Sequence, residues 1–225
     1  MAKSAILKSS IAKKVAMALS GLFLILFLTQ HLFINSTSLF GADTFNSISH
    51  FMGHNPLVQF VIQPILIVGV LFHFIMGFYL DLKNRSSRPI GYAKYNGGAN
   101  ASWASRNMII TGSVVLAFLG LHFYDFWIPE MNGKYINPDA EHLENATRYF
   151  NELKEHFESP VRTALYCLSF VLLSLHLWHG FNSSFQSVGF NNKYSKGLYK
   201  FAKAYAVVVP VGFVIVALFH HFNQY

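Results

Sequence analysis

The histidines are the residues of this chain that most clearly point to chemistry. Eleven occur among 225 residues, and His31, His73, His122 and His176 lie inside long apolar stretches. His179 follows His176 by about one helical turn. Ionisable side chains within an apolar membrane segment are costly, so their presence there indicates function. An imidazole can bind a metal ion or carry a proton, and the partners of each histidine decide between these roles.

The composition indicates an integral membrane protein. The chain is 53% hydrophobic and only 12% charged, whereas soluble domains usually carry about 25% charged residues. Cys167 is the single cysteine, which excludes an internal disulfide. The sequence also lacks C-x-x-C-H, so a covalently attached c-type haem is excluded.

Five apolar runs are long enough to cross a bilayer, which takes about 20 residues. We therefore predict an all-α, polytopic, five-helix membrane bundle that forms a single domain. A further helix is predicted between the third and fourth runs, where apolar residues recur at helical spacing with acids between them. We expect it to lie on the membrane surface. The predicted spans are 15–34, 57–80, 108–128, 161–181 and 204–222, and the amphipathic surface helix is 138–157.

The connections between these runs alternate in charge. The N-terminal segment and the second and fourth loops hold 13 of the 17 basic residues. The first loop, 36–56, has no Lys or Arg, and the third, 129–160, is mainly acidic. The positive-inside rule then puts the N-terminus in the cytoplasm and the C-terminus outside. The net charge of +7 therefore marks a cytoplasmic face, and we expect no nucleic-acid partner.

The four buried histidines fall at two depths. With a rise of about 1.5 Å per residue, His31 and His122 reach the outer half of the bundle and His73 and His176 the inner half, roughly 10–13 Å apart. Each pair comes from two different helices. Two facing imidazoles suit a haem b, whose iron takes one axial ligand on each face.

Small residues and helical stripes agree with this interpretation. Gly69 and Gly77 flank His73 by one turn on each side, and Gly180 follows His176 by one turn. A flat macrocycle needs such small residues in order to approach the backbone. Two stripes end near the outer histidines and predict inward-facing surfaces: Ser20, Leu24, Phe27, His31 and Asn35, and Thr111, Val115, Phe118 and His122.

Other roles fit the pattern less well. Zinc prefers ligands clustered at one depth, often with cysteine or carboxylate. A proton relay usually includes buried Asp or Glu, whereas Asp81 and Asp125 lie only near the ends of spans. Simple packing is the remaining alternative for each histidine alone. The spacing also leaves open whether His176 or His179 is the fourth ligand. The remaining six histidines lie in loops or at the end of a span, and we expect them not to be ligands.

Several stretches together resemble a known family, the five-helix di-haem cytochrome b anchors of succinate dehydrogenases and fumarate reductases. They are SGLFLILFLTQHLF around His31, G-x-x-x-H at His73, TGSVVLAFLGLH ending at His122, and H-x-x-x-G-x8-G from His176 through Gly180. The resemblance covers nearly the whole chain. In the family the ligand stands four residues before the first glycine of the last pattern, which favours His176 over His179. It also implies that His73 and His176 hold the inner haem b and His31 and His122 the outer one.

The resemblance implies partners and a location as well. A flavoprotein subunit with FAD would oxidise succinate, and an iron–sulfur subunit would pass on the electrons, both docked on the cytoplasmic face of a bacterial inner membrane. This chain has neither a nucleotide motif nor iron–sulfur cysteines, so its own part would be quinone-linked electron transfer in respiratory complex II. We also consider a dimer of such three-subunit complexes.

Further site residues follow only from the resemblance. The quinone in such anchors is typically menaquinone, expected near the outer haem. Polar residues at that end of the bundle are Gln30, Asn35, His50, Gln59, Gln63 and Asp125. Arg106 and Lys83, at the cytoplasmic ends of their spans, are candidates for contacts with the propionates of the inner haem. For all of these, ordinary interfacial polarity is the alternative.

One departure from the family bears on direction. Relatives that reduce fumarate and route protons across the membrane carry a Glu two residues before the fourth ligand, where this chain has Ser174. This favours succinate oxidation. Electrons moving to an outer quinone would each gain about 2.3 kcal/mol per 100 mV of membrane potential, so an uncoupler is expected to slow succinate oxidation in intact cells.

Two other functions remain alternatives. The chain could be the di-haem cytochrome b subunit of another quinone-linked enzyme, such as a hydrogenase or formate dehydrogenase, and co-purifying partners would distinguish that case. It could also be a transporter or scaffold whose histidines only pack, in which case it would contain no haem.

Overall fold

Five long helices dominate the computed structural model, which describes residues 9–87, 103–138, 145 and 147–223. All five are long and apolar enough to cross a membrane, which confirms the prediction of five helices of that length and composition. Each helix is longer than its predicted run. They are α2 (Ser10–Thr37), η1 with α4 (Val58–Ile62 and Gln63–Ser86), the helical run beginning with α6 (Met108–His122), α10 (Pro160–Ser187) and α11 (Lys196–Phe222).

Helix starts follow ordinary capping chemistry. The Ser9 hydroxyl accepts a hydrogen bond from the Ala12 N–H at the start of α2, and the Ser159 hydroxyl accepts one from Arg162 at the start of α10. Pro160 occupies the first turn of α10, where its missing N–H costs no hydrogen bond. Local sequence therefore fixes where α10 begins.

The third span extends beyond its predicted end at residue 128. After α6 the chain continues through η3 (Phe123–Trp127), α7 (Ile128–Met131) and η4 (Asn132–Ile136). Both η segments are π-helical turns, which insert an extra residue into a helix and often occur at functional sites. The first follows His122 immediately and turns Asp125 into the protein, where it is 3% exposed.

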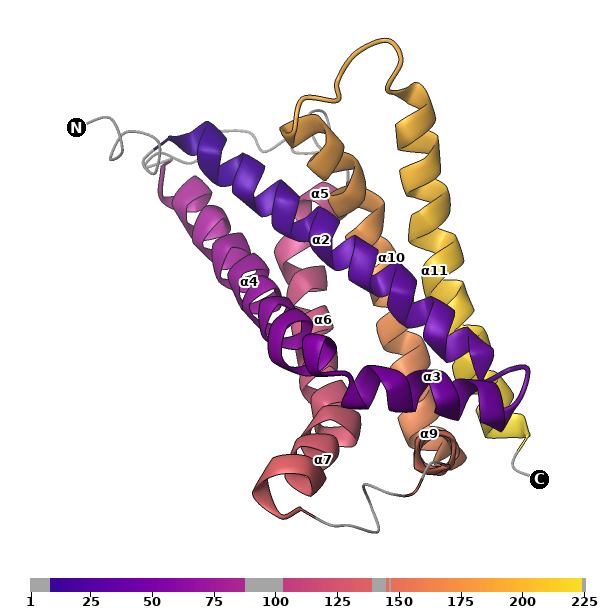
Figure 1. Ribbon diagram of the computed structural model, residues 1–225. Coiled ribbons are helices and arrows are strands. Elements are labelled where there is room, and N and C mark those ends of the chain that lie inside the picture. Colours follow the sequence, from indigo (N-terminus) through magenta and orange to yellow (C-terminus); the bar gives the residue numbers. More distant parts are fainter. Residues whose placement is uncertain (1–8, 88–102, 139–144, 146, 224–225) are drawn as a thin grey trace.

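Shorter helices lie at the ends of the bundle. Helix α3 (Ala42–His54) lies across the end opposite the N-terminus, where α9 (Arg148–Glu158) also lies, and α5 (Trp103–Arg106) lies at the other end (Figure 1). Helix α3 was not foreseen in the first loop. Helix α9 overlaps the predicted 138–157, although it begins only at Arg148 and ends at Glu158; residues 139–144 and 146 of that prediction lie outside the described residues.

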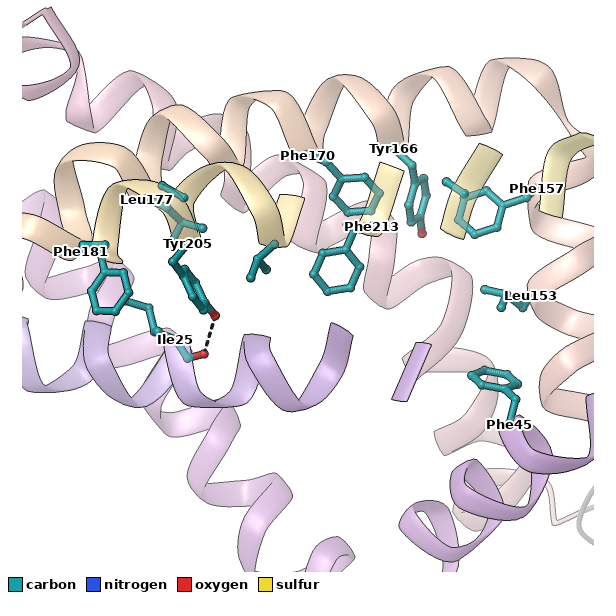
Figure 2. Close-up of a cluster of buried hydrophobic side chains, with 14 residues drawn as sticks. Ile25, Phe45, Leu153, Phe157, Tyr166, Phe170, Leu177, Phe181, Tyr205 and Phe213 are labelled. Atoms are coloured by element: carbon teal, nitrogen blue, oxygen red, sulfur yellow. Dashed lines mark hydrogen bonds between the residues drawn. The ribbon is translucent and has the colours of Figure 1, made fainter. Parts of the chain in front are cut away.

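The apolar core is centred on α10 and α11 and extends to α2, α3 and α9. Phe170 stacks on Phe213 with their ring centroids 5.2 Å apart, and the Tyr205 hydroxyl lies 2.9 Å from the Ile25 carbonyl (Figure 2). Ala202, Ala206 and Ala217 of α11 are fully buried. Small residues at such contacts let helix backbones approach closely, as is common between membrane helices.

Helix α4 is much less enclosed by protein than α11. None of its residues is buried, whereas nine residues of α11 are. His73 on α4 is therefore held by a few specific contacts with α2 and α10, and not by a surrounding core.

We predict that Ala206→Leu destabilises the bundle by about 1–3 kcal/mol, because added volume at a fully packed contact forces strain. The measurement is thermal unfolding of the purified chain in detergent. Ala204→Leu is the matched control, since Ala204 is exposed on the same helix. Equal unfolding midpoints for the two variants would contradict this packing of α11.

Candidate functional site

The structure brings His31 of α2 beside His122 of α6. Their ring centroids are 5.7 Å apart and their planes are nearly perpendicular, at 81°. Phe27 stacks on His31 and Phe118 on His122, each four residues earlier on the same helix. Phe213 of α11 also lies 5.7 Å from His31. The pair is thus enclosed by aromatic rings from three helices.

A second pair joins α4 and α10. The ring centroids of His73 and His176 are 6.4 Å apart at an interplanar angle of 74°. It is the ring of His176, and not that of His179, that lies against His73. His179 is half-buried one turn further along α10. The two pairs predicted from depth are therefore brought together as pairs.

Both pairs have dimensions that suit a bis-imidazole haem. When two imidazoles bind the same metal ion from opposite sides, each at the usual metal–nitrogen distance of about 2.0 Å, their ring centroids are roughly 6 Å apart. The ring separations at both positions therefore fit a bis-imidazole haem. His122 Nδ1 is buried and, within the described residues, has no hydrogen-bond partner.

The polar neighbours of the second pair come from adjacent helices. Ser20 Oγ of α2 lies 3.0 Å from His73 Nδ1, and Thr111 Oγ1 of α6 lies 3.4 Å from His176 Nδ1. Both hydroxyl residues are buried. Sequence reasoning placed them on inward-facing stripes but gave them no role; the signal that could have found them is a Ser-Gly or Thr-Gly pair preceding each outer histidine.

The glycines near the paired histidines admit side chains of neighbouring helices. A Cβ on Gly69 would lie 2.8 Å from a ring carbon of Phe23, and one on Gly180 would lie 3.0 Å from the Met108 methyl group. A Cβ on Gly77 would lie 3.5 Å from the Met17 methyl group. These contacts explain why small residues stand there, and the role of the three glycines beside a macrocycle stays a prediction.

The two basic candidates lie at the end of the bundle where α2 begins. Lys83 is exposed in the last turn of α4, and Arg106 is exposed at the end of α5. Helix α5 contacts both α6 and α10, so Arg106 belongs to the same end as the His73–His176 pair. Their contact with propionates stays a prediction.

The polar residues proposed near a quinone separate into two groups. One lies on or beside α3: Gln30 approaches Met52, His50 stacks on His54 at 4.0 Å, and Gln59 accepts a hydrogen bond from the Tyr135 hydroxyl. Gln63 begins α4 beside this group.

Asn35 and Asp125 already have partners inside the protein. The Asn35 amide donates to the His31 carbonyl at 2.9 Å. Asp125 accepts a 2.8 Å hydrogen bond from the Tyr166 hydroxyl and pairs with Arg162 at 3.3 Å. These contacts place Asp125 in a separate polar cluster one turn beyond His122.

An ionic cluster that sequence reasoning missed fastens the end helices together. Glu130 of α7 pairs with Lys134 and Arg148, and it accepts a hydrogen bond from the Tyr149 hydroxyl. Lys134 also donates to the Gly53 carbonyl of α3. Burial alone lowers the pKa of Arg148, but its hydrogen bond with Glu130 and the charge of that residue outweigh burial, so the pKa is raised.

Four histidines outside the two pairs have other hydrogen-bond partners. His54 bonds to the His50 carbonyl, His156 to Arg162, His220 to the Ser38 hydroxyl and His221 to the Phe157 carbonyl. His142 lies outside the described residues.

One comparison with known proteins bears on identity. Over 117 residues the chain is 28% identical to the succinate dehydrogenase cytochrome b558 subunit of Bacillus subtilis (strain 168). The chain is a distant relative of that subunit. The match covers 51% of this chain and 54% of the relative, so the chain spans about half the length of the curated relative it matches.

Two further comparisons gave no match. No model of a known protein family matches the chain. No solved structure matches it either.

We predict that Glu130→Gln lowers the stability of the bundle by about 3–5 kcal/mol, because it removes the carboxylate that pairs with two largely buried cations. The side chains of Lys134 and Arg148 are each only 4% exposed. Thermal unfolding in detergent measures the effect. Glu155→Gln is the control, because Glu155 is exposed on α9, and an equal loss in both variants would contradict the role of the cluster.

Proposed function

We propose that this chain is the membrane-anchor cytochrome b subunit of a succinate:menaquinone oxidoreductase. The observation that carries the proposal is that four imidazoles form two pairs. Each pair joins two helices of the bundle, and its ring centroids lie at a separation that suits one haem. The distant relationship to a succinate dehydrogenase cytochrome b558 subunit supports the same function. The relative's name implies haem, and two haems b follow from the two pairs.

In this proposal His73 and His176 hold the inner haem, and His31 and His122 hold the outer one. Bound haem b supplies a one-electron carrier whose potential depends on its ligands and their surroundings. The protein contributes the ligands, fixes their orientation from four different helices and surrounds the outer pair with aromatic rings. Such an apolar shell limits the access of solvent and so affects the potential of a bound haem.

The charge distribution supports an orientation and a docking face. Lys13, Lys14, Lys83 and Arg106 lie at the end of the bundle where α2 begins and α4 ends. We assign that end to the cytoplasm by the positive-inside rule. The flavoprotein and iron–sulfur subunits would dock there, and the chain would reside in a bacterial cytoplasmic membrane.

Menaquinone would then react at the opposite end, near His31 and His122. The group beside α3, which includes Gln30, His50, Gln59 and Gln63, offers hydrogen-bonding side chains at that end. Asp125 is held by Tyr166 and Arg162, which makes it a less available partner for a quinone. Succinate oxidation itself belongs to the flavoprotein subunit.

The test is the haem content of the purified complex, measured as the pyridine haemochrome, in the wild type and in two variants. We expect two haems b per chain in the wild type and one in His176→Ala, because His176 faces His73. His179→Ala is the matched control and should retain both.

The same preparations identify the partners. Succinate dehydrogenase activity should co-purify with the chain. A wild-type chain without haem would contradict the cytochrome assignment, and a haem-containing chain that purifies with a hydrogenase or formate dehydrogenase would contradict the assignment to succinate oxidation.

A further inference from the structure

Two buried hydroxyl groups contact the inner histidine pair from neighbouring helices. Ser20 Oγ of α2 lies 3.0 Å from Nδ1 of His73 on α4. Thr111 Oγ1 of α6 lies 3.4 Å from Nδ1 of His176 on α10. Each contact therefore links the helix of a proposed ligand to a helix that carries an outer histidine.

Each hydroxyl also has a backbone carbonyl of its own helix within donating distance. We use these carbonyl contacts to decide whether the hydroxyl or the imidazole is the donor. Ser20 donates to the Met17 carbonyl at 2.8 Å, and Thr111 donates to the Met108 carbonyl at 3.0 Å. A hydroxyl has a single proton to donate but two lone pairs that accept. The oxygen therefore accepts from the imidazole, and Nδ1 of His73 and of His176 carries the hydrogen.

This assignment decides which nitrogen is left for a metal. In a neutral imidazole one nitrogen carries the hydrogen and the other keeps a lone pair. With Nδ1–H donating to a hydroxyl, Nε2 is the nitrogen with the lone pair in both residues. Metal-binding histidines commonly use their second nitrogen in this way, and the bond fixes both tautomer and ring orientation.

Each hydroxyl residue is followed by a glycine that lets the imidazole approach the helix. A Cβ on Gly21 would lie 3.3 Å from Cε1 of His73, and one on Gly112 would lie 3.4 Å from Cε1 of His176. The first distance is tighter than most real contacts, so a larger residue would push the ring away from its hydroxyl. In both dipeptides, Ser20-Gly21 and Thr111-Gly112, the first residue contacts the imidazole and the second leaves room for its ring.

The same spacing occurs on both helices. Ser20 precedes His31 by eleven residues, and Thr111 precedes His122 by eleven, so the pattern [S/T]-G-x9-H occurs twice. Eleven residues make about three helical turns, roughly 16 Å, and return to the same helix face. Helices α2 and α6 therefore each present an outer histidine and, three turns away, the hydroxyl that contacts an inner one.

We infer that Ser20 and Thr111 are positioning residues that hold His73 and His176 as Nδ1–H tautomers with Nε2 directed to the inner haem. The inference rests on the proposed function for the presence of that haem. An acceptor on Nδ1–H makes the imidazole a more basic ligand, which favours the ferric state. Its removal should therefore raise the midpoint potential of the inner haem and leave the outer one unchanged.

The experiment is redox titration of the purified complex, followed optically, for Ser20→Ala and Thr111→Val. The inner haem is identified as the one absent from His176→Ala. Loss of a partner of this kind costs about tenfold or more in affinity; a tenfold loss confined to the ferric state corresponds to about 59 mV for a one-electron couple. We expect an upward shift of that order for Ser20→Ala and a smaller one for Thr111→Val, whose contact is longer.

Controls separate positioning from general packing. Ser113→Ala removes a hydroxyl from an exposed site on α6 that bonds only to its own helix, and it should leave both potentials unchanged. Ser20→Thr and Thr111→Ser retain an acceptor and should restore the wild-type potential. Ser20→Ala could instead lose the inner haem altogether. In that case, retention of the inner haem by Ser20→Thr would support the inference as well as a shift in potential does.

Two results would overturn the inference, and they are distinguishable. A wild-type complex with two haems, but with unchanged potentials in Ser20→Ala and Thr111→Val, would contradict the hydroxyl assignment alone. A wild-type complex without haem would contradict the proposed function, and the assignment would fail with it.

Discussion

An imidazole placed inside a membrane bundle needs partners for its ring nitrogens, because the surrounding hydrocarbon offers none. In this protein, partners for the inner histidines come from the hydroxyl groups of Ser20 and Thr111, which lie on other helices. These two contacts link α2 to α4 and α6 to α10. The placement of the four helices therefore rests on polar contacts as well as on apolar packing, such as that of Phe118 of α6 against Phe170 of α10.

Apolar packing is distributed unevenly among the five long helices. Helices α10 and α11 share a tightly packed core of aromatic and small side chains, including Phe170, Phe213 and Ala206. Helix α4 has no buried residue, and His73 links it to α2 through one hydrogen bond and the contact at Gly21. At the end of the bundle where α3 lies, the charged side chains that pair with Glu130 link α3, α7 and α9. The bundle therefore combines a rigid half with a half whose geometry depends on a few specific contacts.

Much of this architecture was predictable from the sequence. The lengths of the apolar runs predicted the five long helices, since a bilayer imposes a minimum length. The rise per residue along those helices gave the depth of each histidine, and equal depths paired His31 with His122 and His73 with His176. The surface elements were harder. Helix α3 has little charge patterning, and the end of the third span was obscured by Pro129, across which the helical run continues between two π-helical turns.

The polar partners of the inner histidines could not be found from spacing alone. A hydroxyl in an apolar run most often bonds to its own helix, as Ser113 does. Only the tertiary structure shows that Ser20 and Thr111 bond to their own helices and also contact the imidazole of a neighbouring helix. Likewise, the cluster of Glu130, Lys134 and Arg148 joins residues whose association depends on how the end helices fold over the bundle.

The central claim is that the four histidines act as two pairs, each holding one haem. The most direct test is the optical and electron paramagnetic resonance spectrum of the complex after replacement of each histidine by alanine. The two-pair arrangement predicts that His31→Ala and His122→Ala lose the same low-spin signal, and that His73→Ala and His176→Ala both lose the other. Loss of different signals by the two members of a pair, or retention of both signals in any of the four variants, would contradict it.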